Sequence, residues 1–130
     1  MTNCIANEIL KLGYTVLYQT APALLDTIID YKFGKHTVPM DAYDTIIACD
    51  LLIIDDLGTE NLNSLKFTEL FNIINTRLLN QNNKVTKTII STNLDLQDLF
   101  ATYDRRLVSR IAGYYNVCMF YGEDLRFNAL

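Results

Sequence analysis

Two adjacent carboxylates at the end of an apolar run are the residues of this chain best placed to do chemistry. Four branched apolar residues, Leu51 to Ile54, lead without a break into Asp55 and Asp56. A run that is apolar at every position is typical of a parallel strand buried on both faces. Open α/β sheets bind ligands beyond the carboxyl ends of such strands, where carboxylates favour Mg²⁺ together with a phosphate. We therefore predict a magnesium site at Asp55 and Asp56; the alternative is a buried strand followed by an Asp-rich turn.

Polar residues at two other predicted strand ends extend this candidate site. Asn93 closes a β-branched strand, and an amide beside an acid can orient an attacking water, so Asn93 could share a water with Asp56. A helix that carries Arg105, Arg106 and Arg110 follows Asn93. Each has a plainer alternative: Asn93 could cap the next helix, and the arginines could form a solvated helix face.

Around these residues, the hydrophobic pattern predicts helices that alternate with strands. We expect helices over 2–11, 20–33, 42–49, 64–81, 95–100 and 103–112, and strands over 14–19, from 51 onward, over 86–93 and over 116–121. Thr20 and Ser64 are the expected N-caps of two of the helices. This alternation predicts an α/β fold with a mostly parallel sheet and right-handed crossovers.

Length and composition favour one globular domain over residues 1–130. The chain has 130 residues, of which 50% are apolar, which is enough to bury a core. It contains no apolar run of about 18 residues or more, so we expect no membrane span. The first residues have neither a basic flank nor a long apolar stretch, so we expect no signal peptide.

Cysteine usage and net charge narrow the functional classes further. The 3 cysteines are far apart in the sequence and odd in number, which favours free thiols in a reducing cytosol over a disulfide framework or metal cluster. We therefore expect a cytoplasmic protein. The net charge of −4 argues against a broad nucleic-acid surface, although it leaves room for a small basic patch.

One short segment superficially suggests a phosphate loop. Gly34-Lys35-His36-Thr37 contains the Gly-Lys pair and the only histidine of the chain. A phosphate loop requires Gly-x-x-x-x-Gly-Lys-Ser/Thr, but His36 follows the lysine and Ile29 stands at the earlier glycine position. We therefore interpret His36 as a solvated loop residue.

Three segments together resemble a known family. They are Leu52 to Glu60 (LIIDDLGTE), Ile89 to Leu94 (IISTNL) and Tyr103 to Ile111 (YDRRLVSRI). They resemble the AAA+ ATPase domain of DnaC/DnaI-type bacterial replicative helicase loaders, and the resemblance covers essentially the whole chain. IstB-type transposition helper ATPases share much of the pattern. The resemblance implies a three-layer P-loop NTPase fold of AAA+ type.

The same resemblance implies roles for individual residues. Asp55 matches the Walker B acid that holds Mg²⁺ with ATP or ADP, and Asp56 matches the catalytic acid that activates water. Asn93 matches the sensor-1 residue, and Arg110 matches the arginine finger that reaches the nucleotide of a neighbouring subunit. Arg106 lies one helical turn earlier on the same face. Arg126 loosely matches a sensor-2 arginine; its alternative is a plain surface residue.

The chain departs from the family pattern at its start. The family's first strand and its Gly-Lys-Thr loop have no counterpart, and Thr2 to Leu10 matches the helix that follows that loop. We expect a partial domain that begins after Walker A and that by itself binds ATP weakly or not at all, because loop amides and the lysine supply most phosphate-binding energy. Its unpaired strand edges are expected to be closed by the 116–121 strand or by a second chain.

Three functions compete at this stage. The first is a helicase-loader ATPase domain whose ATP-controlled assembly involves the replicative DNA helicase, single-stranded DNA and self-association through the arginine-finger face. The second is a non-catalytic interaction module that keeps this face; a transposition helper is a variant of the first. The third is a phospho-receiver domain, which should carry a lysine after its last strand, where this chain has Gly122-Glu123-Asp124. We favour the first.

Overall fold

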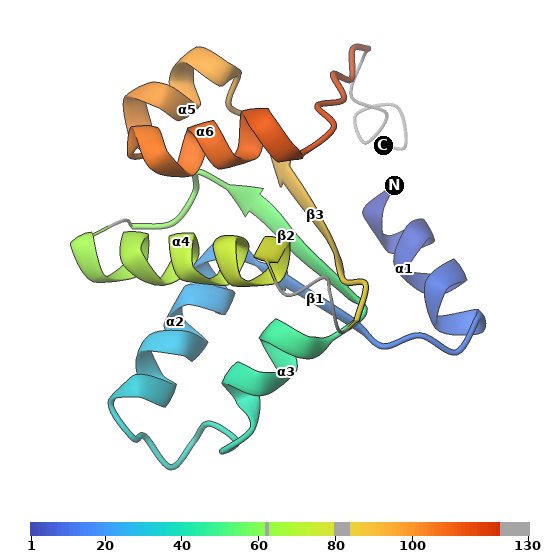
Figure 1. Cartoon of the computed structure of the whole chain (residues 1–130), viewed down its shortest axis with the longest axis vertical. Helices are drawn as coiled ribbons and strands as arrows, with labels where there is room; N and C mark the ends of the chain where they lie inside the picture. The colour runs from blue at the N-terminus through green and yellow to red at the C-terminus, as the bar shows by residue number, and fades with distance from the viewer. Residues whose placement is uncertain (62, 80–83, 123–130) are drawn as a thin grey trace, which may run out of the picture.

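The computed structural model describes residues 1–61, 63–79 and 84–122, in which helices alternate with strands (Figure 1). In chain order the elements are α1 (Thr2–Lys11), β1 (Val16–Thr20), α2 (Ala21–Lys32), α3 (Ala42–Ala48), β2 (Leu51–Leu57), α4 (Ser64–Leu79), β3 (Lys87–Thr92), α5 (Leu96–Thr102) and α6 (Arg105–Tyr114). Each of these elements was predicted from the sequence to within a few residues. No helix in the described ranges is long and apolar enough to span a membrane.

The three strands form one parallel sheet in the order β1-β2-β3. Leu51 pairs with Val16 on one side and with Lys87 on the other, so the apolar run 51–54 lies on the central strand. The predicted parallel α/β sheet is therefore confirmed, and the carboxyl end of the central strand carries the two acids.

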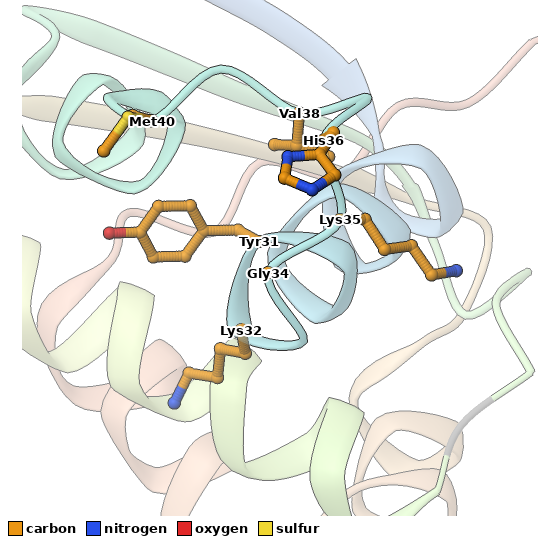
Figure 2. Close-up of a pocket in the computed structure, with 7 residues that line it drawn as sticks. All are labelled: Tyr31, Lys32, Gly34, Lys35, His36, Val38 and Met40. Atoms are coloured by element: carbon orange, nitrogen blue, oxygen red, sulfur yellow. The ribbon is translucent and has the colours of Figure 1, made fainter.

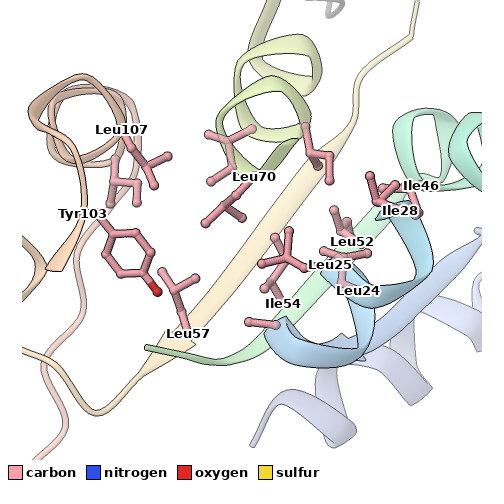
Figure 3. Close-up of a cluster of buried hydrophobic side chains, with 14 of the residues drawn as sticks. Leu24, Leu25, Ile28, Ile46, Leu52, Ile54, Leu57, Leu70, Tyr103 and Leu107 are labelled. Atoms are coloured by element: carbon pink, nitrogen blue, oxygen red, sulfur yellow. The ribbon is translucent and has the colours of Figure 1, made fainter. Parts of the chain in front are cut away.

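Helices cover both faces of the sheet, which gives three layers (Figure 1). One face of β2 presents Leu51 and Ile53, which pack with Ala6 of α1 in a small cluster. The other face presents Leu52 and Ile54 to a larger core, drawn in Figure 3, that α2, α3, α4, α5 and α6 complete. Because residues 51–54 of β2 are buried on both sides, each of these positions needs an apolar residue.

Side-chain caps fix where several helices begin. The Thr20 hydroxyl accepts a hydrogen bond from the Ala23 amide at 3.3 Å, as predicted. The prediction that Ser64 caps α4 is wrong, because Ser64 is already the first helical residue. The side-chain oxygen of Asn63 accepts a hydrogen bond from the backbone amide of Lys66 at 2.9 Å, so Asn63 is the cap. Asn and Ser are comparable caps, so sequence preference alone does not decide between neighbours.

One buried arginine joins the helix α4 to α3 and to the sheet. Arg77 is 1% exposed. Its guanidinium donates to the carbonyl oxygens of Ile46, Ile47 and Cys49, at 2.9, 2.9 and 3.0 Å, and to that of Lys87 at 2.7 Å. These bonds satisfy carbonyls at the end of α3 that would otherwise be buried without a donor. Arg77 thereby ties the last turn of α4 to the end of α3 and to the start of β3.

The predicted strand at 116–121 is wrong. Residues 116–121 form neither a helix nor a strand. Val117, Phe120 and Tyr121 are exposed, with exposed fractions of 53%, 71% and 86%. High β-propensity predicts a strand only where a neighbouring strand offers hydrogen bonds and a covered face, and within the described residues this segment has neither. The segment does not close the sheet, so β1 and β3 are the edges of the sheet that the described residues form.

Candidate functional site

A row of three hydrogen-bonded side chains holds Asp55 at the carboxyl end of the sheet. The Tyr18 hydroxyl on β1 donates to Asp55 Oδ2 over 2.7 Å. The Ser91 hydroxyl on β3 donates to Asp55 Oδ1. Each of the three strands thus contributes one residue. The row lies on the α1 side, because Asp55 follows Leu51 and Ile53 in the alternation of β2.

The first turn of α1 completes this row. Thr2 Oγ1 lies 3.1 Å from the Tyr18 hydroxyl oxygen. Since Tyr18 gives its one proton to Asp55, Thr2 is the donor in this contact. Two hydrogen bonds hold the pKa of Asp55 below its ordinary value; the one from Ser91 has the larger effect and the one from Tyr18 the smaller. Asp55 is therefore an oriented anion at neutral pH.

Asp56 has a backbone conformation that few residues adopt. Its φ is +57°, the one positive φ of a non-glycine residue in the described ranges. The register of β2 against β3 shifts between Ile54 and Leu57, so a bulge surrounds the acid pair. Its amide donates to Ser91 Oγ over 3.1 Å, which ties Asp56 to the same hydroxyl that holds Asp55. Aspartate tolerates this left-handed region better than most residues, and backbone strain of this kind is concentrated at functional sites.

Asn93 lies at the same edge of the sheet as the acids. Leu57 pairs with Thr92, so Asn93 follows β3 immediately beyond the end of β2, and its side chain is exposed. It is not the cap of α5; that cap is Asp95, whose carboxylate accepts from the Asp98 amide at 2.8 Å. The helix-capping alternative for Asn93 is therefore excluded.

The arginines follow on α6, above the strand ends (Figure 1). Arg105 and Arg106 are exposed, and Arg110 is half-buried. The Arg106 guanidinium lies 5.5 Å from the centre of the Phe71 ring on α4, and that of Arg110 lies 5.8 Å from the Tyr114 ring. In the part of the chain that the structure describes, neither one pairs with Asp55 or Asp56. Arg126 lies outside the described residues.

Comparisons with known proteins identify the fold. No protein-family model and no curated protein sequence matches the chain. Among solved structures, the replication initiator DnaA bound to AMPPCP and single-stranded DNA is 27% identical, with a TM-score of 0.69 over 85% of this chain and 32% of its own. AMPPCP-bound DnaA from Aquifex aeolicus is also 27% identical, with a TM-score of 0.64 over 83% of this chain and 32% of its own. The DnaC helicase loader is 22% identical, with a TM-score of 0.63 over 83% of this chain and 62% of its own.

This chain has the AAA+ fold of replication-initiation proteins. The resemblance found in the sequence is thereby confirmed at the level of the fold. The chain spans 32% of the length of the DnaA chains and 62% of the DnaC chain.

The donor set at the carboxyl end of β2 fits Mg²⁺. The described residues hold no group of three or more His, Cys, Asp or Glu side chains that could bind a metal by themselves. Mg²⁺ keeps several of its waters and is commonly held by one or two carboxylates together with substrate phosphates. An ionised Asp55, with lone pairs left on both oxygens, and an exposed Asp56 match that mode.

A hollow that the structure shows lies elsewhere. It measures about 510 Å³ and is lined by the end of α2 and the loop that follows it, so none of the acids lines it. Figure 2 shows Lys32 and Lys35 diverging on either side of Gly34. Lys32 pairs with Glu69 at 2.5 Å and Lys35 with Asp30 at 2.9 Å, so neither cation is free for a phosphate. Gly34 to Thr37 follows the helix α2, whereas a phosphate loop follows a strand. This position agrees with the poor match of the segment to the phosphate-loop motif.

Sequence reasoning missed Tyr18, Ser91 and Thr2. Tyr18 and Ser91 lie 37 and 36 residues from Asp55, and both were interpreted only as strand formers. The one available signal was a hydroxyl near the carboxyl end of each neighbouring parallel strand, because those ends meet at one edge of the sheet.

Proposed function

We propose that this chain is part of an ATP-controlled AAA+ domain of the DNA-replication helicase-loader type. The observation that carries the proposal is the Tyr18–Asp55–Ser91 row, which orients an ionised carboxylate at the end of the central strand beside the first turn of α1. The DnaA structures bound to AMPPCP support nucleotide as the ligand of such a domain.

In this proposal each predicted residue keeps one task. Asp55 holds Mg²⁺ with ATP or ADP, and Mg²⁺ supplies charge neutralisation for the phosphates. Asp56 accepts the proton of the water that attacks the terminal phosphate, and Asn93 orients that water. Hydrolysis then breaks the bond to ADP and releases phosphate.

In the proposal, α6, which carries Arg106 and Arg110, faces a neighbouring copy of the chain. Arg110 reaches the nucleotide of a neighbouring copy, and Arg106 supports it from the same helix face. Arg126 is the proposed sensor-2 arginine. Self-association would therefore depend on nucleotide.

The partners that we propose are the replicative DNA helicase and single-stranded DNA, in the cytoplasm. The helicase-loader function of DnaC and the single-stranded DNA bound to DnaA support them. Three free cysteines are in keeping with a reducing compartment. An IstB-like transposition helper remains the alternative within the same fold.

Isothermal titration calorimetry with Mg²⁺ and ATP or ADP tests the function. Two proteins are compared: this chain, and a form extended by whatever the reading frame encodes upstream. We expect tight binding in the extended form, loss of binding in its Asp55→Asn variant, and weak or no binding in the 130-residue chain, which contains no Gly-x-x-x-x-Gly-Lys-Ser/Thr motif. Tyr14→Phe, an exposed tyrosine before β1, is the control. Absence of binding in the extended form would contradict the proposal and favour the interaction module.

A further inference from the structure

Glu60 connects the loop after the acids to the start of the arginine helix. Its Oε2 accepts a hydrogen bond from the Gly58 amide at 2.8 Å. Its Oε1 accepts a hydrogen bond from the Tyr103 hydroxyl, which belongs to a residue 43 positions further along the chain. One carboxylate therefore joins two segments that are otherwise separate in the sequence.

Tyr103 is a firm anchor on the α6 side. It is 4% exposed and packs in the main core, and Figure 3 shows its hydroxyl directed toward Leu57 at the end of β2. Burial, followed by the hydrogen bond to Glu60, raises the pKa of Tyr103 well above its ordinary range, so the hydroxyl remains a donor. The next residue, Asp104, is the N-cap of α6 and accepts from the Arg106 amide at 2.7 Å.

The loop on the acid side is equally fixed. Gly58 has a φ of +103°, and a Cβ there would lie 2.6 Å from Leu94 Cδ1, just beyond β3. The Thr59 amide and hydroxyl donate to the Asp56 carbonyl oxygen at 3.2 and 2.8 Å. A displacement of Glu60 would therefore be transmitted directly to Gly58 and Asp56.

Apolar packing holds α6 against the core but supplies no directional bond. Leu107, Val108 and Ile111 bury its inner face in the core, but the hydrophobic effect is non-directional. A hydrogen bond restricts both distance and angle. The bond between Tyr103 and Glu60 is a directional contact that joins the residue before the N-cap of α6 to the loop behind the acids.

We propose that Glu60 is a positioning residue: through Tyr103 it sets the place of α6, with Arg106 and Arg110, relative to Asp55 and Asp56. A change in the position of Asp55 and Asp56 then moves the face of α6 that carries Arg106 and Arg110. A partner bound to that face in turn changes the position of the two acids. The functional meaning of this linkage rests on the proposed function, whereas the linkage itself is a property of the chain without nucleotide.

Nuclear magnetic resonance on the whole chain tests the linkage without any ligand. Residual dipolar couplings report the orientation of α6 relative to β2, and amide hydrogen exchange reports local opening. The test variants are Tyr103→Phe and Glu60→Gln. The matched controls are Tyr43→Phe, which keeps the ring that stacks on Tyr31, and Glu8→Gln at an exposed ion pair.

In wild type and in both controls, we expect one relative orientation of α6 and β2 to fit the residual dipolar couplings of both elements. In both test variants, the couplings should show a changed orientation of α6 relative to β2. Exchange in α6 and at Gly58 should be about tenfold faster or more, the usual effect of losing one hydrogen bond to a charged group. Exchange in α2 should change less than about twofold, and the double variant should match either single variant because the two residues form one contact.

Equal acceleration in α2 and α6 with unchanged dipolar couplings would reduce Glu60 to a general stabilising contact and overturn the proposal. Unchanged hydrogen exchange and unchanged dipolar couplings in α6 would overturn the proposal as well. Neither result depends on nucleotide, so failure here is distinct from failure of the proposed function, which calorimetry measures.

Discussion

The Tyr18 hydroxyl donates to Asp55 Oδ2 over 2.7 Å, from a strand that pairs Thr20, rather than Tyr18, with Asp55. The diagonal reach is possible because both side chains point to the α1 face of the sheet and the tyrosine ring spans the difference. With Ser91 on the other side, the contact restricts the Asp55 carboxylate to one orientation.

Removing Ser91 should raise the pKa of Asp55. The hydrogen bond from Ser91 is the largest cause of the lowered value, so Ser91→Ala should return the midpoint toward the ordinary value of about 3.9. Carbon-detected titration of the Asp55 carboxyl group measures this midpoint. Thr45→Ala, a hydroxyl far from Asp55 on α3, should leave it unchanged. A wild-type midpoint at or above the ordinary value would contradict the described contacts.

The same shift determines how stability depends on pH. A lowered pKa in the folded state means that the unfolded chain binds more protons, so Asp55 stabilises the fold above its ordinary pKa. This contribution is lost as pH falls below about 4 through the folded pKa. Urea unfolding at several acidic pH values should show a smaller loss in Ser91→Ala than in wild type.

Substitutions at Asp56 should reveal the cost of its left-handed backbone. At φ +57° glycine is free of strain, whereas alanine pays about 1–2 kcal/mol. We expect the free energy of unfolding to fall in the order Asp56→Gly, wild type, Asp56→Ala. Asp41, at φ −98°, is the control, and Asp41→Gly should not be stabilising. Equal stability of Asp56→Gly and Asp56→Ala would exclude backbone strain at this acid.

Two glycines should respond in opposite ways to alanine. Gly58→Ala puts a Cβ 2.6 Å from Leu94 Cδ1 at a φ of +103°, so it should lower the free energy of unfolding by about 1–3 kcal/mol. Gly113 lies within α6 with open space around it, so Gly113→Ala should raise it by about 0.5–1 kcal/mol. Urea denaturation of both variants measures the difference, and a neutral Gly58→Ala would argue against the tight contact with Leu94.

Replacement of Arg77 should be among the most damaging changes outside the site. Arg77→Met leaves buried carbonyls at the end of α3 without donors, and we expect a loss of about 3 kcal/mol or more. Arg77→Lys should also be destabilising, since an ammonium cannot reproduce the planar fork of donors. The exposed Arg105→Met should stay within about 0.5 kcal/mol of wild type, and thermal unfolding compares the three.

The sequence by itself determined the elements and the place of the acids. A short apolar run with no polar interruption is typical of a strand covered on both faces, so 51–54 predicted the central strand and put Asp55 and Asp56 at its carboxyl end. The Thr20 cap and Gly13, which ends α1 at a φ of +87°, were equally local signals. Local backbone preference is sufficient for such features.

Only the tertiary structure decided which side chains surround the acids. Tyr18 and Ser91 reach Asp55 because strand register and side-chain alternation put all three on one face, and both depend on pairing between distant segments. The bulge at Asp56 and the contact between Glu60 and Tyr103 arise in the same way. The 116–121 segment shows the converse, since its strong β-propensity forms no strand where no strand among the described residues pairs with it.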